Sequence, residues 1–266
     1  MTAQHTLSTR QLSAGYGDTS ILNGIDITIP TGQITSIIGA NACGKSTLLR
    51  TMSRLLTPHQ GQVLLDGRSI HKMATKDLAK LLGLLPQSPI APEGITVGDL
   101  VSRGRHPYHK LFSQWSSTDD VAIASALKAT NTAELIDRDV DELSGGQRQR
   151  VWIAMALAQE TDILLLDEPT TYLDVAHQIE ILDLMVELNQ DRGTTIILVL
   201  HDLNLAARYS DHLIAMKSGR VFDQGSPQHV MTEPTVHSVF GLNNKVISDP
   251  ISKTPMVLPI GRYKQA

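Results

Sequence analysis

Several features that mark whole classes of protein are scarce or missing in this 266-residue sequence. A single cysteine, Cys43, excludes an internal disulfide framework and is typical of a protein kept in a reducing compartment. No apolar run reaches the roughly 18 residues that a transmembrane helix requires. The N-terminus also lacks the charged-then-apolar pattern of a secretory signal. These absences predict a soluble chain that works in the cytoplasm.

Excess basic charge and a disorder-prone composition are missing as well. The 23 Lys and Arg residues are outnumbered by 27 Asp and Glu residues, and the net charge is −4. There is thus no overall basic field to attract nucleic acid or an anionic lipid surface, and we predict no nucleic-acid partner. The 19 Gly and 12 Pro residues are too few for a disordered or fibrous chain. The length fits one large domain, or one core that carries a smaller lobe.

Apolar patterning predicts an α/β protein. Residues 25–29 alternate isoleucine with polar residues, which indicates a half-buried strand. Helical spacing follows at residues 46–56, where one broad apolar face is expected to carry Leu48, Leu49, Met52, Leu55 and Leu56. Short apolar runs that predict further strands occur at residues 33–39, 62–65, 81–85, 163–167 and 195–200. Alternation of strands with helices implies a parallel sheet with right-handed crossovers.

Residues 89–159 have a helical texture and predict a lobe inserted in the strand-rich core. One helix is expected to have Ser117 or Thr118 as its N-cap and to place Val121, Ala124 and Leu127 on its packed face. The chain is therefore predicted to be one domain with three parts. These are a nucleotide-binding core with a β subdomain at 1–88 and 160–240, a helical subdomain at 89–159 and a weakly patterned tail at 241–266.

A glycine loop carries the first chemical signal. Residues 39–46 read GANACGKS and match the pattern GxxxxGK[ST] between an apolar strand and a helix. Glycines let successive backbone N–H groups point inward, and the helix N-terminus adds positive partial charge, so the loop is suited to a phosphate chain. Lys45 supplies a point charge for the outer phosphates, and the Ser46 hydroxyl is a candidate ligand of Mg²⁺. The alternative, a glycine loop with a surface lysine, fits the strand–loop–helix context poorly.

Polar residues at two other strand ends suggest hydrolysis. Asp167 and Glu168 end the 163–167 strand, and residues at the carboxyl ends of parallel strands face the ligand crevice. Asp167 is expected to hold Mg²⁺, directly or through water, and Glu168 to polarise the attacking water as a general base. His201 ends the 195–200 strand and is expected to reach the γ-phosphate. Taken alone, the acidic pair reads equally well as a surface turn before Pro169.

A second candidate anion site lies at residues 143–147, which read LSGGQ. Ser144, Gly145, Gly146 and Gln147 open a helix, and a helix N-terminus attracts an anion. The alternative is simply a capped helix with a flexible entry. The sequence leaves open whether this helix end acts within the chain or on another copy.

The motifs GANACGKST, LSGGQ and ILLLDEP, with Gln87 and His201 after strands, together resemble the nucleotide-binding subunit of an ABC transporter, over about residues 16–202. This resemblance implies an ATPase with a P-loop NTPase core of mainly parallel sheet, an N-terminal antiparallel β subdomain and an inserted α-helical subdomain. It also implies that two copies enclose two ATP molecules head to tail with Mg²⁺. In such a dimer Gln87 contacts metal or water and relays to a membrane partner.

Site residues follow from the same resemblance. It assigns Tyr16 to stacking on adenine, although an ordinary turn tyrosine is the alternative, and it places Asp174 in a loop that crosses the dimer interface. It assigns the nucleotide to Tyr16, Gly39, Ala40, Asn41, Ala42, Cys43, Gly44, Lys45, Ser46 and Thr47, and to Ser144, Gly145, Gly146 and Gln147 of the second copy. Asp174 is also a plausible N-cap for the helix that follows.

The glycine loop departs from the family pattern at two positions, where Ala40 and Ala42 replace proline and glycine. Alanine at position 42 costs little if its φ is negative and strains the backbone otherwise. Cys43 is expected to serve packing, although a helix N-terminus of this kind can lower a thiol pKa.

Longer stretches resemble the ATPases of iron–siderophore importers, which are related to those for vitamin B12 and haem. These stretches are residues 101–115, 144–159, 167–182 and 225–242. The resemblance implies a separate membrane permease, an indirect partnership with a substrate-binding protein and a location on the cytoplasmic face of the membrane. An ATPase for another chelate is the main alternative. A DNA-repair or chromosome ATPase would require long coiled coils and basic surfaces, which the sequence lacks.

Overall fold

The computed structural model describes residues 5–109, 116–171 and 173–263. The chain forms two compact units, one made of residues 73–196 and the other of residues 5–72 and 197–263. Residues 110–115, which belong to one of the importer-like stretches, and Tyr172 lie outside the described residues.

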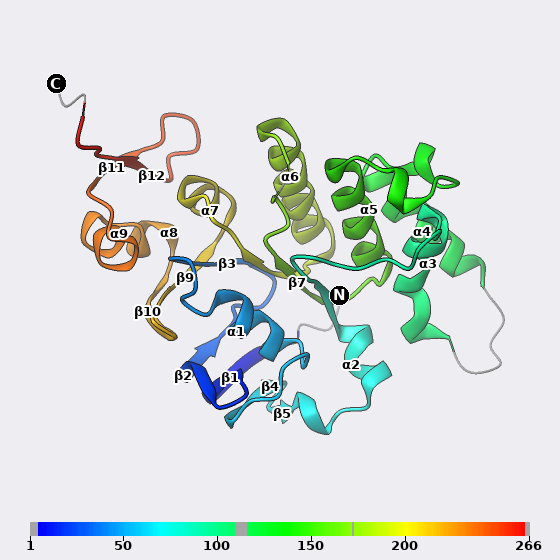
Figure 1. Cartoon of the computed structure of the whole chain (residues 1–266), viewed down its shortest axis with the longest axis horizontal. Coiled ribbons are helices and arrows are strands. Elements are labelled where there is room, and N and C mark those ends of the chain that lie inside the picture. The colour runs from blue at the N-terminus through cyan, green and yellow to red at the C-terminus, as the bar shows by residue number, and fades with distance from the viewer. Residues whose placement is uncertain (1–4, 110–115, 172, 264–266) are drawn as a thin grey trace. The chain divides into compact units, whose positions relative to one another are not determined.

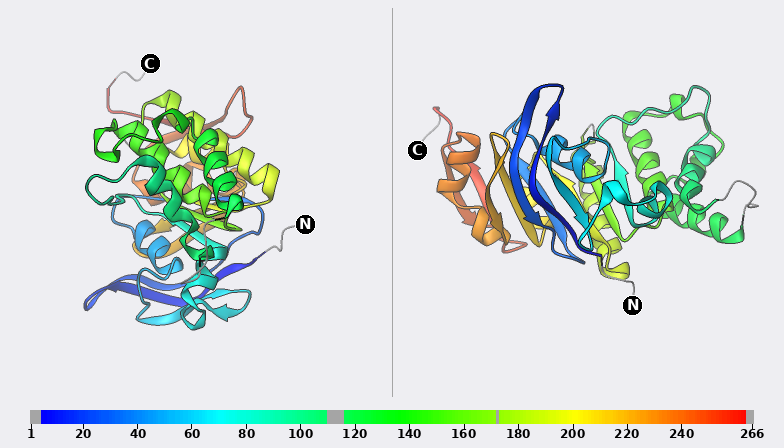
Figure 2. Two further views of the ribbon diagram at one scale, coloured as in Figure 1. Left: turned by 90° about the vertical axis from the view of Figure 1, so that its right-hand side faces the viewer. Right: turned by 90° about the horizontal axis from the view of Figure 1, so that it is seen from below.

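An antiparallel sheet opens the unit of residues 5–72 and 197–263. β1 (Leu7–Tyr16) and β2 (Thr19–Thr28) form a long hairpin, seen as the dark blue strands in Figure 2. β4 (Gln60–Leu65) pairs with the other edge of β1, and β5 (Arg68–Ser69) extends β4. Ile25 and Ile27 are buried while Asp26 is exposed, as the alternation predicts. The predicted N-terminal antiparallel β subdomain is confirmed.

Parallel strands form the core of the same unit. β3 (Ile34–Gly39) is fully buried and pairs in parallel with β9 (His212–Lys217). β10 (Arg220–Gly225) returns antiparallel to β9 through a hairpin turn at Ser218 and Gly219, whose φ values are 49° and 74°. β8 (Thr195–Val199) ends beside β3, where the Leu200 N–H donates to the Ile37 carbonyl at 3.5 Å.

Helix α1 (Lys45–Met52) follows β3 and packs on β1, β2 and β3. It ends four residues before the predicted limit of residue 56, because Arg54 adopts a left-handed φ of 64° that an α-helix does not allow. Leu48, Leu49 and Met52 are buried as predicted, whereas Leu55 is 65% exposed, so its predicted place on the same apolar face is wrong.

The C-terminal part of this unit is more ordered than its weak sequence pattern suggested. α7 (Leu203–Tyr209), α8 (Pro227–Val230) and α9 (Glu233–Phe240) are followed by a hairpin of β11 (Asn244–Ser248) and β12 (Pro255–Pro259). Asn204 on α7 binds the hairpin through both of its amide atoms, which contact the Val257 N–H at 2.7 Å and the Val257 carbonyl at 3.3 Å.

The unit of residues 73–196 contains two parallel strands and the helices that flank them. β6 (Leu82–Leu85) pairs in parallel with β7 (Ile163–Asp167), and all five residues of β7 are buried. The Thr195 N–H, at the start of β8, donates to the Asp162 carbonyl just before β7. The remaining elements flanking these strands are α2 (Thr75–Leu81) and α6 (Val175–Arg192). Short 3₁₀ turns occur at Ile70–Lys72, Arg103–Tyr108, Ala133–Leu135 and Val140–Glu142.

Three helices, α3 (Val97–Ser102), α4 (Ser117–Ala129) and α5 (Gly145–Ala158), pack pairwise into the predicted helical subdomain (Figure 1). The N-cap of α4 is Ser116, one residue before the predicted position. Val121 is 68% exposed and Ala124 is exposed as well, so their predicted place on the packed face of α4 is wrong, whereas Leu127 is buried as predicted. The buried face is completed by Ala122, Ile123 and Ala126.

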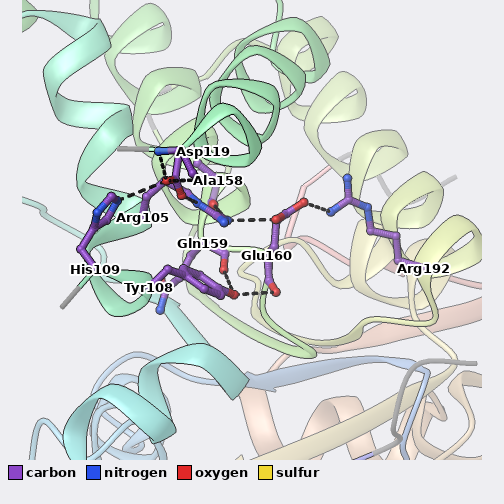
Figure 3. A network of polar contacts seen from close by, with 9 residues as sticks. Arg105, Tyr108, His109, Asp119, Ala158, Gln159, Glu160 and Arg192 are labelled. Carbon is purple, nitrogen blue, oxygen red and sulfur yellow. Dashed lines mark hydrogen bonds and ion pairs between the residues drawn. The ribbon is translucent and has the colours of Figure 1, made fainter. Parts of the chain in front are cut away.

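A buried ion-pair network ties these helices together (Figure 3). Arg105 is 3% exposed, and its guanidinium donates to Asp119 and to Glu160, each at 2.9 Å. The ring of Tyr108 lies 4.1 Å from the guanidinium carbon, and Arg192 reaches the far side of Glu160 at 3.5 Å. The network therefore joins the 3₁₀ turn at Arg103–Tyr108 to α4 and to the end of α5.

The strand pairings confirm the predicted α/β architecture of a mainly parallel sheet with a separate antiparallel sheet. The predicted limits of the core, helical subdomain and tail stay a prediction. Within the described part of the chain, no helix combines the length and the apolar character needed to cross a membrane.

Candidate functional site

The loop between β3 and α1 requires glycine at two positions. Gly39 has a φ of 156°, and a Cβ there would lie 2.5 Å from the Met216 carbonyl oxygen. Gly44, the N-cap of α1, has a φ of 107°, and its Cβ would lie 2.8 Å from a Leu22 methyl group. Both conformations are open to glycine alone without strain. The two glycines of the predicted motif are therefore set by local geometry.

Lys45 lies inside this loop. Its ammonium donates to the Gly39 carbonyl at 2.9 Å and to the Ala40 carbonyl at 3.2 Å, and the residue is 5% exposed. The N-cap of α1 is glycine, which has no side chain to accept from the first-turn N–H groups. A buried cation and the N-terminus of a helix thus lie in one loop, the arrangement that suits a phosphate group.

Ala42 and Cys43 lie in the same loop and differ in backbone conformation and burial. Ala42 has a φ of 61°, so alanine occupies a left-handed conformation and the backbone is strained there. Cys43 is 5% exposed, and burial raises the pKa of its thiol, although the nearby Lys45 ammonium partly opposes the shift. The thiol is therefore protonated and packed, and the pKa lowering that a helix N-terminus can produce is outweighed by burial.

Two other predicted site residues, Tyr16 and His201, lie in the same unit as the β3–α1 loop. Tyr16 is 47% exposed at the end of β1, and its hydroxyl accepts a hydrogen bond from Arg50 on α1 at 3.1 Å. The exposed ring is therefore held at one edge while its face stays accessible. His201 follows β8 at the end that lies beside β3, the strand leading into the loop.

The predicted carboxylates lie at the end of β7, beside Gln87. β6 and β7 run parallel, and Leu85 lies opposite Leu166. Gln87 and Glu168 each follow this pair by two residues, so the strand register places them side by side. The Gln87 amide donates to the Glu168 carboxylate at 2.6 Å. Asp167 is 1% exposed and Glu168 is 8% exposed. Residues 81 positions apart in the sequence therefore meet at one edge of the sheet.

Glu168 adopts an unusual backbone conformation. Its φ is 55°, a left-handed value that strains a residue with a side chain. Thr171 contacts it twice, because its N–H donates to the Glu168 carbonyl at 3.2 Å and its hydroxyl to the carboxylate at 3.3 Å. Sequence reasoning missed Thr171, although threonine is among the residues whose hydroxyl groups form turns.

The LSGGQ segment begins α5 as a complete capping box. The Ser144 hydroxyl accepts from the Gln147 N–H at 3.2 Å, and the Gln147 side chain accepts from the Ser144 N–H at 3.1 Å. The capped-helix alternative is therefore true of this segment, without excluding an anion site. A Cβ on Gly145 would meet no atom of the described residues within 4 Å. Local packing thus gives no reason for glycine at position 145.

Asp174 is the N-cap of α6, as the sequence suggested. Its carboxylate accepts from the His177 N–H at 2.9 Å and contacts the His177 ring nitrogen at 2.8 Å. These hydrogen bonds lower the pKa of Asp174 below its ordinary value. The carboxylate is therefore ionised at neutral pH and keeps the start of the helix in place.

Comparison with known proteins agrees with these features. Residues 22–171 match the ABC transporter family, which covers more than half of the chain. The chain is 57% identical to "Probable siderophore transport system ATP-binding protein YusV" of Bacillus subtilis (strain 168), over 96% of this chain and 93% of that protein. It is 51% identical to the ferric enterobactin transport ATP-binding protein FepC of Escherichia coli (strain K12), over 95% and 93% respectively. The chain belongs to the ABC transporter family.

Solved structures define its class more closely. A structure assigned to the metal-chelate type of ABC transporter, in an inward-facing conformation, matches with a TM-score of 0.82 at 27% identity and covers 97% of this chain and 98% of the other. The ATP-binding cassette MJ0796, solved as a dimer bound to ADP and Pi after hydrolysis, matches with a TM-score of 0.72 at 28% identity over 83% and 98%. The predicted fold class, a P-loop NTPase core, is confirmed, and the chain is an ATP-binding cassette.

Proposed function

We propose that this chain is the ATP-hydrolysing subunit of an ABC importer that takes up an iron–siderophore complex through a separate membrane permease. The observation that carries the ATPase is the loop after β3, where the buried Lys45 ammonium lies at the N-terminus of α1. Support for the cargo comes from relatives named for siderophore and ferric enterobactin transport, which match nearly the whole chain.

ATP is bound mainly through its phosphates. The backbone N–H groups of residues 39–47 surround the phosphate chain, and Lys45 turns from the loop carbonyls to the outer phosphates when nucleotide enters. Tyr16 stacks on the adenine through its exposed ring face. The Arg50 hydrogen bond to its hydroxyl keeps that ring in position.

Magnesium is the metal that the oxygen ligands of the site suit. The Ser46 hydroxyl, the Asp167 carboxylate and the Gln87 side-chain carbonyl are hard oxygen donors, which Mg²⁺ prefers to nitrogen or sulfur. When bound, the ion neutralises charge on the phosphates. Asp167 is buried, so the surrounding protein rather than bulk water orients its carboxylate.

Hydrolysis depends on Glu168 and His201. Glu168 acts as the general base that accepts a proton from the water attacking the γ-phosphate. Gln87 and Thr171 hold its carboxylate by hydrogen bonds before water arrives. His201, at the end of β8, donates a hydrogen bond to the γ-phosphate and loses this partner when the phosphate leaves.

Each nucleotide is completed by a second copy of the chain, in a head-to-tail dimer. Ser144, Gly145, Gly146 and Gln147 of that copy approach the phosphates from the far side, with the N-terminus of α5 facing the anion. The open space at Gly145 supports a close approach by a group from outside the chain. Asp174, at the start of α6, lies in the loop proposed to cross this interface.

The remaining partners follow from the importer class. The dimer binds permease subunits on the cytoplasmic face of the membrane and is a peripheral component there. A substrate-binding protein delivers the chelate and contacts the ATPase only indirectly. Gln87 relays the state of the nucleotide to the permease.

One binding experiment tests the nucleotide site. The Lys45→Ala variant should bind ATP roughly a hundredfold more weakly, because about 3 kcal/mol of charge-assisted hydrogen bonding to phosphate is lost. Lys245→Ala, which removes a lysine on the C-terminal hairpin that is 66% exposed at its side chain, is the matched control and should bind like the wild type. Equilibrium titration with a fluorescent ATP analogue measures both. Unchanged affinity of Lys45→Ala would contradict the assignment.

The cargo is tested by growth. A strain that lacks this gene should fail to grow when one iron–siderophore is the only iron source, and expression of the wild-type chain, but not of Lys45→Ala, should restore growth. Growth defects confined to vitamin B12 or haem as the supplied chelate would replace the siderophore assignment and leave the ATPase assignment intact.

A further inference from the structure

Three glutamine side chains hold the catalytic loop, which we define as residues 168–171 and 173 between β7 and α6. Gln87, after β6, donates to the Glu168 carboxylate at 2.6 Å. Gln149, on α5, donates to the Pro169 carbonyl at 3.0 Å. Gln178, on α6, donates to the Leu173 carbonyl at 3.0 Å and to the Thr170 carbonyl at 3.4 Å. The loop is therefore fixed from three separate elements.

Gln149 is the deepest of the three and has an unusual place in the helix that carries it. It is 9% exposed, and an amide buried to this extent is costly unless it is hydrogen-bonded. It lies little more than one helical turn after Ser144, the N-cap of α5, and two residues after Gln147. A rigid helix segment therefore links the LSGGQ segment to the backbone of the catalytic loop.

The position of the bond along the loop matters as much as its depth. Pro169 directly follows Glu168, whose left-handed φ of 55° is a strained conformation that needs outside support. The Gln149 amide fixes the carbonyl one residue beyond this strained position. A shift of that carbonyl would rotate the adjoining backbone. The Glu168 carboxylate would then move away from the place proposed for the attacking water.

We propose that Gln149 is a positioning residue for hydrolysis, which holds the backbone of the catalytic loop so that Glu168 points at the attacking water, and which transmits movement of the LSGGQ helix to that carboxylate. The proposal rests on the proposed function, because it takes Glu168 as the general base. Gln149 acts through its hydrogen bond to the Pro169 backbone. Its contribution is to the rate of the chemical step rather than to ATP binding.

The Gln149→Met variant tests the donor. Methionine has a similar length and shape but has no N–H, so the Pro169 carbonyl loses its partner while the volume is kept. We expect kcat for ATP to fall roughly tenfold to a hundredfold, as small misplacements of a catalytic group do, with KM and the equilibrium affinity for ATP nearly unchanged.

The Gln149→Glu variant tests the same donor within one folded protein. A protonated carboxyl donates to the Pro169 carbonyl, whereas the ionised form presents only acceptors and repels it. Burial raises a carboxyl pKa, which brings this titration toward neutral pH. At each pH, the kcat of the variant is divided by the kcat of the wild type. For Gln149→Glu this ratio should fall severalfold between about pH 5.5 and pH 8.5. For Gln149→Met the same ratio should not change with pH.

Gln159, at the opposite end of α5, offers a matched control. Its amide donates to the Ala79 carbonyl at 2.5 Å, which is the same kind of side-chain-to-backbone bond on the same helix. Gln159→Met should leave kcat and its pH profile like those of the wild type. The melting temperature of each variant shows how much stability each substitution removes.

The outcomes separate the inference from the function on which it rests. Wild-type protein that binds no ATP or releases no phosphate would overturn both. An active wild type with full kcat in Gln149→Met, or with an equal loss in Gln159→Met, would overturn the positioning role alone. If Gln149→Met does not fold, the Gln149→Glu ratio decides, and a flat ratio across pH overturns the role.

Discussion

Two residues with side chains occupy left-handed backbone conformations at the segments that carry the chemistry. Ala42 has a φ of 61° in the loop before α1, and Glu168 has a φ of 55° after β7. Such conformations cost about 1–2 kcal/mol for an L-amino acid and persist where surrounding contacts hold them. Glu168 has visible support in Gln87 and Thr171, whose hydrogen bonds reach its carboxylate. The proposed role of Glu168 in hydrolysis gives a reason for strain at this position.

Ala42→Gly should stabilise the protein. Glycine removes the strain of the left-handed conformation, about 1–2 kcal/mol, but it adds about 0.4–1 kcal/mol of entropy to the unfolded chain, so the net gain is roughly 0.5–1 kcal/mol. Urea unfolding without nucleotide measures it. Ala40→Gly is the control, because residue 40 is not among those with positive φ and should lose stability instead. A loss in both variants would contradict the strain argument.

At the scale of elements, the helical subdomain depends on one buried cation. Arg105 lies in the 3₁₀ turn after α3 and binds Asp119 on α4, the Ala158 carbonyl at the end of α5 and Glu160 just beyond it (Figure 3). Buried ion pairs add little net stability compared with apolar packing, but removal of one partner leaves a buried charge uncompensated. The network therefore specifies how the three helices meet.

Arg105→Met should destabilise the protein by about 3–5 kcal/mol, because Asp119 is left buried without its guanidinium. Arg192→Met is the matched control at the exposed end of the same network, where the side chain is 46% exposed, and it should cost less than about 1 kcal/mol. Chemical denaturation of both variants measures the difference. Similar small losses in the two would show that the buried end contributes no more than the surface end.

The same network predicts a pH dependence. Hydrogen bonds from Ser116, together with the Arg105 guanidinium, lower the pKa of Asp119 from its ordinary 3.8 to about 2, against the effect of burial. A depressed pKa means that the ionised form stabilises the fold, fully so above about pH 4, and that this stability is lost as the pH falls toward 2.

Asp119→Asn provides the test of that sign. The difference in unfolding free energy between the wild type and this variant should be constant from about pH 7 to pH 5 and should shrink as the pH falls from about 4 toward 2. Urea unfolding at several pH values measures it. A difference that grows on acidification would contradict the assignment.

At the scale of the whole molecule, the chain belongs to a class of proteins that form dimers, as in the MJ0796 structure. In the proposed head-to-tail dimer, bound ATP contributes negative charge that both copies contact. Hydrolysis is then expected to remove part of this bridge and to shift the population toward the open state.

Glu168→Gln should separate binding from hydrolysis in this assembly. The amide cannot accept the proton of water, so phosphate release should fall at least about a hundredfold while ATP affinity is kept. The variant should accumulate as a dimer when ATP and magnesium are present, as light scattering after size exclusion would detect. Glu134→Gln, at an exposed glutamate of the helical subdomain, should behave like the wild type. Rapid turnover by Glu168→Gln would remove the base assignment.

The sequence by itself determined the local elements and the motifs they carry. The run at β7, the hairpin turn at Ser218 and Gly219 and the glycine loop before α1 each depend on residues close together in the chain. Periodicity and allowed φ values act over a few residues, so these features are readable from the order of the amino acids. The family resemblance rests on the same local motifs.

Only the tertiary structure decided the contacts between distant segments. The register of β6 against β7 brought Gln87 to Glu168, and packing of α5 brought Gln149 to Pro169. Burial, which depends on every neighbour at once, raised the thiol pKa of Cys43 where its place before a helix suggested the opposite. Such effects arise from surfaces that meet only after folding, and no short window of sequence contains both partners.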